Sequence, residues 1–357
     1  MKRLDRYMLK EMIGPMLVGT VIIALLFMAN EFISIFKNFD VSNLPKLAVI
    51  QMVMFRMPHW LSMTLPAGTA IGVALAISRM ARESEVTAMR AAGISLRRLL
   101  LPVVLMGSLA AVANYLIVEK LIPPAALKYR QVRNQASVLG PGPIFRSNVM
   151  LSLDGKSASF GSVQRTADGR ILLNDILLIE RPRAGESVVF SADEGSYDDG
   201  VWYFQSPLIR FFSGGELVSI KTEDVVTINE RIRIADMFIA PMPEEETAAD
   251  LKEAIQDRKR SHGDTTLLEV AYHVKFSLPF SCLVFALSSA IMALALVRSG
   301  PFVGLIVSMV LVMAYYNIHI VATEIVGRNG WLPPGPSAWL PNVIFAAVAA
   351  VVLWRIE

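Results

Sequence analysis

Six long stretches without Asp, Glu, Lys or Arg restrict the fold of this chain more than any other feature. A helix crosses the hydrocarbon core of a membrane with about 20 mainly apolar residues, and each stretch has that length or nearly so. A soluble chain of 357 residues does not supply six such runs, and it carries more charge than the 18% found here. The sequence therefore predicts six transmembrane helices. The stretches cover residues 12–30, 57–78, 99–118, 276–297, 299–323 and 329–354.

Several functional classes are excluded by what the chain lacks. The net charge of +3 is too small to indicate a nucleic-acid partner, and a single cysteine, Cys282, cannot form an intramolecular disulfide. The four histidines show no ligand spacing within one element, and neither HExxH nor GxSxG occurs. Asp154-Gly155-Lys156-Ser157 resembles the end of a phosphate-binding loop, but Met150 stands where that loop needs glycine, so we interpret it as a turn. We expect no catalytic site, no metal, no cofactor and no nucleic acid.

Basic side chains are distributed unequally between the short loops that connect the six stretches. Loops on the cytoplasmic side of a membrane carry an excess of Lys and Arg. One side holds three, Lys37, Lys46 and Arg328, and we assign it to the outside. Both termini are therefore expected in the cytoplasm, with the large segment after the third stretch outside. The other side holds eleven: Lys2, Arg3, Arg6, Lys10, Arg79, Arg82, Arg90, Arg97, Arg98, Arg298 and Arg355.

The outward segment, residues 121–269, has a different character. It contains short runs rich in β-branched and aromatic residues, separated by turn signals such as Asp199-Gly200. Regular spacing of short strands predicts an all-β, jelly-roll-like domain, with polar helical stretches at 128–135 and 244–260. The strand-like runs are 149–153, 171–180, 187–192, 201–204, 208–212 and 216–221. We therefore expect three domains: transmembrane helices 1–3 in residues 1–120, the β domain in 121–269 and transmembrane helices 4–6 in 270–357.

Five polar side chains lie inside or beside the apolar stretches: Glu31, Arg56, His59, Asn114 and His319. Polar groups are costly in lipid and usually face a cavity or a partner. For Glu31 and Arg56 we expect the side chains to reach the membrane interface. For Asn114 and His319 we expect hydrogen bonds between helices.

The loop between the second and third stretches carries the strongest local signal. Val86 and Met89 form a narrow apolar stripe at helical spacing, and Glu83 and Glu85 lie where a helix dipole favours carboxylates. Gly93 is a suitable C-terminal stop. We expect a short helix at about 80–93 that either docks into a groove of a soluble partner or lies as an amphipathic linker on the membrane surface.

Four motifs make the chain resemble the LptF/LptG (YjgP/YjgQ) permease family of the lipopolysaccharide export ABC transporter. They are LDRYMLKEMIGP at the first stretch, Leu65-Pro66 in the second, RESEVTAMRAAGISLRRL after it and EVAYHVKFSLPFSCLVFAL at the fourth. The third motif is the most specific. The order of three spans, an outward β domain and three more spans matches the family as well, so the resemblance covers nearly the whole chain.

The resemblance implies a half-transporter in the bacterial inner membrane that extracts lipopolysaccharide. Two such subunits pair, an LptB-type ATPase dimer hydrolyses ATP beneath them, and the periplasmic β-jellyroll passes the lipid to an LptC/LptA-type bridge. The permease is not itself an enzyme. The carboxylate that family members use in their coupling helix matches Glu85. The resemblance places ATPase coupling at Glu83, Glu85, Met89, Arg90 and Gly93.

The resemblance is weaker where family members present basic residues to lipid phosphates, at the end of the first span. Residues 29–34 of this chain read Ala-Asn-Glu-Phe-Ile-Ser, which is acidic instead. We therefore expect substrate contacts from other basic groups near the outer interface: Arg56, His59, Lys128, Arg130 and Arg133.

Two other functions remain open from the sequence alone. One is a membrane-anchored scaffold in envelope assembly, without a transport cycle. The other is a solitary secondary transporter, which would be expected to have broken helices and midplane charges; such charges are sparse here. A stoichiometric ATPase partner distinguishes transport from scaffolding.

Overall fold

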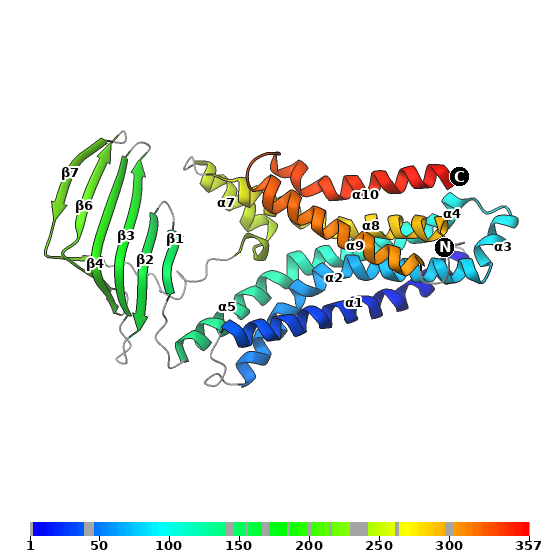
Figure 1. The fold of residues 1–357 in the computed structure, drawn as a ribbon, viewed down its shortest axis with the longest axis horizontal. Coiled ribbons are helices and arrows are strands. Elements are labelled where there is room, and N and C mark those ends of the chain that lie inside the picture. The colour runs from blue at the N-terminus through cyan, green and yellow to red at the C-terminus, as the bar shows by residue number, and fades with distance from the viewer. Residues whose placement is uncertain are drawn as a thin grey trace. The chain divides into compact units, whose positions relative to one another are not determined.

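The computed structural model of the chain describes residues 3–38, 46–139, 146–153, 156–165, 171–183, 186–198, 201–213, 216–228, 242–260, 264–296 and 303–356. These residues form two compact units, a helical unit and a β unit (Figure 1). The helical unit takes chain segments from both sides of the strands, and the β unit consists mainly of Asn134–Ala240.

The helical unit contains six helices that are long and apolar enough to cross a membrane, which confirms the six predicted spans. Its elements in chain order are α1 (Arg3–Asn38), α2 (Lys46–Arg82), α3 (Glu85–Ala91), α4 (Leu96–Leu116), the π-helical η2 (Ile117–Leu121), α5 (Ile122–Leu139), the 3-10 helix η3 (Pro243–Glu245), α7 (Ala248–Arg260), α8 (Thr266–Ala295), α9 (Val303–Ile320), the π-helical η5 (Val321–Gly327) and α10 (Pro334–Ile356). The spans are α1, α2, α4 continued by η2 and α5, α8, α9 continued by η5, and α10.

The helical unit has two ends that carry different groups. Figure 1 shows α3 at the same end as both termini, and we call this the α3 end. We call the opposite end, which holds η3, the η3 end. The helix α2 has 37 residues and connects the two ends. At 1.5 Å per residue it is about 55 Å long, well beyond the roughly 30 Å of a hydrocarbon core.

The helices α1 and α2 pack against each other along a narrow seam. Met8, Met12, Met16, Thr20 and Ala24, spaced four residues apart, are all buried on one face of α1. Side chains at this spacing lie above one another on a helix. The opposite face of α1 is exposed and apolar, and its most exposed members are Leu17, Val18, Val21, Ile22, Leu25 and Leu26.

Glycines on α2 allow the two backbones to approach closely. A Cβ atom added to Gly72 would lie 2.6 Å from the Cα of Met16, and one added to Gly68 would lie 2.8 Å from the backbone nitrogen of Thr20. Real Cβ atoms do not come this close to a backbone. Small residues play this part in membrane proteins because helices in lipid associate by close packing and not by the hydrophobic effect.

The β unit is one antiparallel sheet in which β4 pairs with two different strands, β5 and β6, along the same edge. Its order is β1-β2-β3-β4-β5-β8, while β6 pairs with both β4 and β7. β4 divides its pairing, since residues 194–198 pair with β5 and residues 186–191 pair with β6. The strands are β1 (Arg146–Leu153), β2 (Lys156–Arg165), β3 (Ile171–Arg183), β4 (Glu186–Asp198), β5 (Val201–Gln205), β6 (Leu208–Ser213), β7 (Glu216–Thr222) and β8 (Val225–Ile228).

Large apolar side chains form the core of the β unit. Phe190 of β4 meets Phe204 of β5 edge to face, with ring centroids 4.9 Å apart, and both rings are buried. On β3 the buried residues are Leu173 and Ile176, which are three positions apart and so break the alternation of a regular strand. Between them Asp175 has a left-handed φ of +50°, which turns the following side chains to the other face.

The prediction of an antiparallel β domain between the third and fourth spans is confirmed, although two strands were missed. The six predicted runs fall on β1 and on β3 to β7, but β2 and β8 were not predicted. The turn predicted at Asp154-Gly155 lies outside the described ranges; the residues on either side of it, Leu153 and Lys156, pair directly. The β unit is narrower than residues 121–269, because α5 as far as Arg133, together with η3 and α7, belongs to the helical unit.

The close approach at Gly72 generates a stability prediction. We expect Gly72→Ala to lower the thermal stability of the detergent-solubilised protein, because the new methyl group meets the Met16 backbone. Overpacking of this kind costs about 1–3 kcal/mol. Gly14→Ala on α1 is the matched control, since an added Cβ there has no atom within 4 Å. Equal melting temperatures for the two variants would show that the seam is not tightly packed.

Candidate functional site

A short helix, α3, connects α2 to α4 at the end of the helical unit that also holds both termini (Figure 1). It has seven residues, and none of them is buried. The predicted helix at about 80–93 is in fact divided, because α2 continues to Arg82 and Ser84 then takes a left-handed φ of +60° that turns the chain into α3. Gly93 follows α3 with a φ of +83°, a conformation that glycine adopts without strain.

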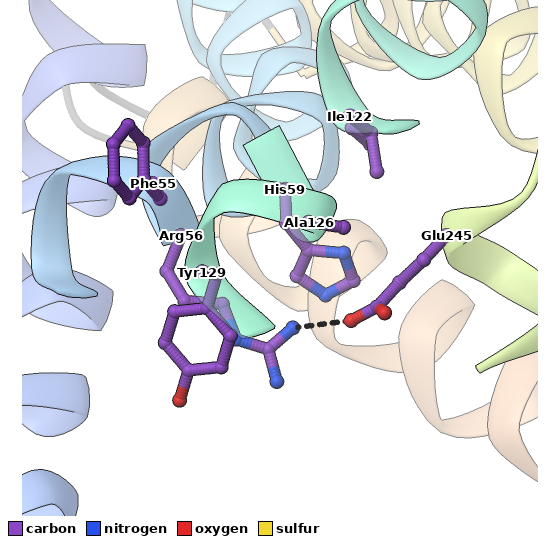
Figure 2. Close-up of a pocket in the computed structure, with 7 residues that line it drawn as sticks. All are labelled: Phe55, Arg56, His59, Ile122, Ala126, Tyr129 and Glu245. Carbon is purple, nitrogen blue, oxygen red and sulfur yellow. Dashed lines mark hydrogen bonds and ion pairs between the residues drawn. The ribbon is translucent and has the colours of Figure 1, made fainter. Parts of the chain in front are cut away.

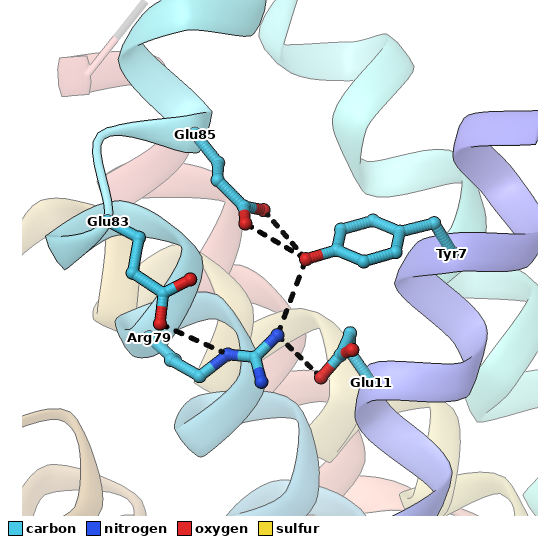
Figure 3. A network of polar contacts seen from close by, with 5 residues as sticks. All are labelled: Tyr7, Glu11, Arg79, Glu83 and Glu85. Carbon is cyan, nitrogen blue, oxygen red and sulfur yellow. Dashed lines mark hydrogen bonds and ion pairs between the residues drawn. The ribbon is translucent and has the colours of Figure 1, made fainter.

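Figure 3 shows a polar network that ties α3 to the first two spans. The hydroxyl of Tyr7 donates a hydrogen bond to Glu85, with distances of 2.9 and 3.1 Å to its two carboxylate oxygens. The guanidinium of Arg79 lies 2.5 Å from Glu11 and 3.8 Å from Glu83. It also donates a 3.4 Å hydrogen bond to the Tyr7 hydroxyl. The side chains come from α1, α2, the turn after α2 and α3.

The charges in this network do not balance. Three carboxylates, Glu11, Glu83 and Glu85, face one guanidinium, which gives a net charge of −2 (1 − 3). Within the described residues, no Lys, Arg or His lies within ion-pair distance of Glu85, and its close partner is the neutral Tyr7 hydroxyl. The arrangement can therefore receive a cationic side chain from another protein.

The other residues predicted for coupling divide into two kinds. Val86 and Met89 are partly buried and pack against the core that α1, α2, α4 and α8 share. Arg90 is exposed at the last turn of α3, where a cation interacts favourably with the helix dipole. The apolar stripe of α3 thus faces the helical unit, while Arg90 and part of Glu85 face outward.

A second cluster gathers at the η3 end, where two predicted substrate-binding residues share the carboxylate of Glu245. Figure 2 shows the first of them, Arg56, beside Glu245. Arg56 of α2 lies 3.4 Å from Oε1 of Glu245, and Arg130 of α5 lies 3.5 Å from Oε2. Arg56 also lies 3.6 Å from Glu31 of α1, and its guanidinium stacks 4.9 Å from the centre of the Tyr129 ring. Glu31 and Arg56 are thus largely buried and paired with each other, while their position at the membrane interface stays a prediction.

The remaining basic candidates lie on the same two helices, α2 and α5. His59 lies one turn after Arg56 and lines the same small pocket. Lys128 is exposed, with its ammonium 5.9 Å from the centre of the Phe55 ring. Arg133 is partly exposed and lies three residues beyond Arg130 on α5. Asn114, in contrast, makes the predicted interhelical hydrogen bond, from its side-chain amide to the carbonyl of Ser62 at 3.0 Å.

Three functional groups were missed in the sequence. Glu245 is the centre of the cluster at the η3 end, yet it is one of three consecutive glutamates that look alike. Both carboxylate oxygens of Glu119 on η2 accept hydrogen bonds at 3.1 Å from the backbone nitrogen of Ala248, at the start of α7. The ammonium of Lys275, whose side chain is 2% exposed, lies 3.8 Å from Glu119. A signal was available here, since Glu119 and Lys275 directly flank the uncharged runs 99–118 and 276–297.

An open cavity of about 180 Å³ lies between α2, η2, α8 and η5 at the same end. Its walls are mostly apolar, and they include His59, Lys275 and His319. Nδ1 of His319 and Nζ of Lys275 have no hydrogen-bond partner in the described part of the chain, so His319 does not show the predicted interhelical bond through that atom. Small-molecule pockets measure roughly 300–1,000 Å³, so this cavity is too small for a whole lipid.

Side chains able to hold a metal do not cluster in the ranges that the structure describes, where no group of three or more His, Cys, Asp or Glu residues gathers suitably. The contacts observed at the two clusters are ion pairs and hydrogen bonds. Next to the cluster at the η3 end lies the carboxyl group of Glu246, whose pKa is raised by partial burial and by the neighbouring Asp250.

Comparison with known proteins decides the family. A family model described as lipopolysaccharide export system permease LptF/LptG matches residues 6–355. The chain belongs to the LptF/LptG family. It is similar to the lipopolysaccharide export system permease protein LptF of Escherichia coli (strain K12) and to that of Shigella flexneri. Each is 22% identical over 98% of this chain and 94% of the relative.

Family membership and the six apolar helices together make this LptF/LptG protein a multi-pass protein of the inner membrane. The family is one of permeases in lipopolysaccharide export, and the relatives are named as permease proteins and not as enzymes. The two polar clusters described above therefore belong to a membrane transport protein. One lies at the α3 end of its spans and the other at the η3 end.

The buried pair of Glu119 and Lys275 generates a second stability prediction. Removing one partner of a buried ion pair costs about 3–5 kcal/mol, because a buried charge is left uncompensated. We expect Glu119→Gln to lower the free energy of unfolding by an amount at the lower end of that range, since Glu246 and Asp250 also attract the Lys275 ammonium electrostatically. The loss is measured as a lower melting temperature in detergent, with faster trypsin cleavage in α7. The double variant Glu119→Gln/Lys275→Met should recover stability; no recovery would contradict the pairing.

Proposed function

We propose that this chain is one half of the membrane part of an ABC transporter that extracts lipopolysaccharide, or a related glycolipid, from the inner membrane. A second LptF/LptG-type subunit forms the other half, and a separate LptB-type ATPase dimer hydrolyses ATP. The observation that carries the proposal is the carboxylate of Glu85, which lies on an unburied helix without a cationic partner among the described residues.

The geometry of α3 suits the transmission of force from a docked ATPase. A partner cation that binds Glu85 pulls on a side chain already bonded to Tyr7 of α1. Met89 fixes the apolar side of α3 to the helical core, so α3 cannot move without the spans to which it is attached. Arg79 links the same network to α2. Docking at α3 is thus connected to two spans by direct contacts.

We propose that the α3 end faces the cytoplasm and the β unit faces the periplasm. The excess of Lys and Arg in the short loops supports this orientation. The two termini lie at the same end as α3, as an even number of spans requires (Figure 1). The ATPase dimer would then meet α3 from the cytoplasm, where ATP is available.

We also propose that the β unit passes the lipid to an LptC/LptA-type periplasmic bridge. Exposing an acyl chain of about a dozen carbons to water costs on the order of 10 kcal/mol, at about 0.8 kcal/mol per methylene. A lipid with several chains therefore needs continuous shielding between the membrane and the bridge. A β unit that exposes apolar side chains such as Val218 and Ile220 of β7 can supply an apolar surface of this kind.

The docking role of Glu85 is tested by association with the ATPase. We expect Glu85→Ala and Glu85→Lys to weaken the complex by about 2 kcal/mol or more, roughly 30-fold in Kd, because a close charge pair across the interface is lost. The measurement is the amount of ATPase that co-purifies with the membrane subunits. Glu253→Gln, an exposed carboxylate on α7, is the control and should retain the ATPase.

Undiminished association of the ATPase with both Glu85 variants would show that Glu85 is not part of the interface with the ATPase. If wild-type membranes yield no stoichiometric ATPase at all, the chain acts instead as an envelope-assembly scaffold.

Orientation is tested by cysteine labelling of intact cells. We expect a cysteine at Asp199, in the β unit but outside the described residues, to react with a membrane-impermeant thiol reagent added from outside. A cysteine at Ser84, beside α3, should react only after the membrane is opened. The native Cys282 is buried, so the unsubstituted chain provides an unlabelled background. The opposite pattern would reverse the proposed orientation.

A further inference from the structure

Two arginines from different helices converge on a single carboxylate at the η3 end. Arg56 comes from α2, Arg130 comes from α5, and Glu245 comes from the one-turn helix η3. The side chain of Glu245 is only 8% exposed, and those of Arg56 and Arg130 are 20% and 15% exposed. Buried ionised groups require compensation, and Glu245 supplies a large part of it for both guanidinium groups.

These contacts leave hydrogen-bonding capacity unused. Charge-assisted hydrogen bonds between guanidinium and carboxylate are about 2.7–2.9 Å long and are often paired in a fork. Here each arginine touches Glu245 through one nitrogen, at 3.4 and 3.5 Å. The buried Nε atoms face carboxylates, that of Arg56 at 3.6 Å from Glu31 and that of Arg130 at 3.5 Å from Glu245, yet within the described ranges neither makes a hydrogen bond. The carboxylate of Glu245 therefore leaves part of the hydrogen-bonding capacity of both guanidinium groups unused.

The depth of the cluster is that of a lipid headgroup. Arg56 precedes Arg79 on the same helix by 23 residues (79 − 56), which corresponds to about 35 Å along α2. The hydrocarbon core is about 30 Å thick. With Arg79 at one membrane surface, Arg56 lies at the other, where the phosphate groups of lipids are found.

We propose that Glu245 holds the position of a lipid phosphate, and that a phosphorylated lipid displaces it from Arg56 and Arg130. This inference rests on the proposed function and names the headgroup chemistry that the site recognises. A phosphate monoester has three acceptor oxygens and a charge of about −1.5 to −2. It can accept forked hydrogen bonds from both arginines, which the single carboxylate does not do.

Displacement of Glu245 has a mechanical consequence. η3 belongs to the chain segment that follows the last strand and leads through α7 into α8. In the absence of lipid, Glu245 fixes that segment to α2 and α5 through its two ion pairs. A bound phosphate frees η3 from α2 and α5, so the arrival of lipid is converted into release of the turn that precedes α7, while α7 stays attached through Glu119.

The test follows hydrogen exchange in the wild-type transporter reconstituted in nanodiscs with its ATPase. Backbone amides of residues 242–247 are compared without ligand, with bisphosphorylated lipid A, with the same lipid after removal of both phosphates, and with inorganic phosphate. We expect faster exchange only with the phosphorylated lipid. Faster exchange with inorganic phosphate alone would show a free-anion site and overturn the lipid assignment.

A charge-neutral variant tests the competition directly. We expect Glu245→Gln to bind bisphosphorylated lipid A about tenfold more tightly than the wild type, because the internal competitor no longer reduces the fraction of free sites. Binding of the dephosphorylated lipid should not change. Glu253→Gln is the control, an exposed carboxylate on α7 whose neutralisation should alter neither affinity.

The outcomes separate this inference from the proposed function. If the ATPase associates and the lipid binds, but exchange at 242–247 does not respond and Glu245→Gln binds no more tightly, Glu245 is only a structural brace and the inference fails. If neither ATPase nor lipid associates with the wild type, the proposed function itself fails. The exchange experiment uses the wild type alone, so it decides the question even if the variant does not fold.

Discussion

The close approach of α1 and α2 at Gly68 and Gly72 is the contact on which the rest of the structure depends. Because neither glycine has a side chain, the backbone of α2 comes within van der Waals distance of the backbone of α1 at Met16 and Thr20. α1 needs this contact, since the opposite face is exposed and apolar, as expected of a helix that meets lipid or a second membrane subunit. The seam therefore fixes the position of a helix that has few other neighbours within the chain.

Both polar clusters are built on this helix pair. At the α3 end, α1 supplies Tyr7 and Glu11 to meet Arg79 of α2. At the η3 end, α1 supplies Glu31 to meet Arg56 of α2. At one end this helix pair contacts Glu85 of α3, the carboxylate proposed to bind the ATPase, through Tyr7. At the other end it supplies Arg56, one of the two arginines proposed to bind lipid phosphate. A displacement of α1 and α2 changes the contacts in both clusters. The two clusters are therefore coupled through a continuous set of packed side chains.

Much of this architecture could be predicted from the sequence, and the failures concern features that no local pattern marks. The spans were found because an uncharged run of about 20 residues is rare outside membrane helices, and Gly93 was found because helix ends favour glycine. β2 was missed because its Ser- and Gly-rich sequence lacks the apolar alternation of a strand. The role of Glu245 could not be predicted, because its partner Arg56 is 189 residues away and nothing local distinguishes it from its two glutamate neighbours.

The charge balance of the two clusters explains why they suit different ligands. At the η3 end two arginines meet two carboxylates, so the net charge is zero (2 − 2), as a largely buried site beside lipid requires. Such a site accepts a new anion only by giving up one of its own, which makes binding an exchange and couples it to movement. At the α3 end the side chains are more exposed and water screens them, so a net charge of −2 can persist without an internal partner. This unbalanced negative charge attracts a cationic side chain of a partner protein, which can bind without displacing an internal group. The same two helices therefore contact the docking helix α3 at one end and contribute, at the other, to a set of ion pairs that must open.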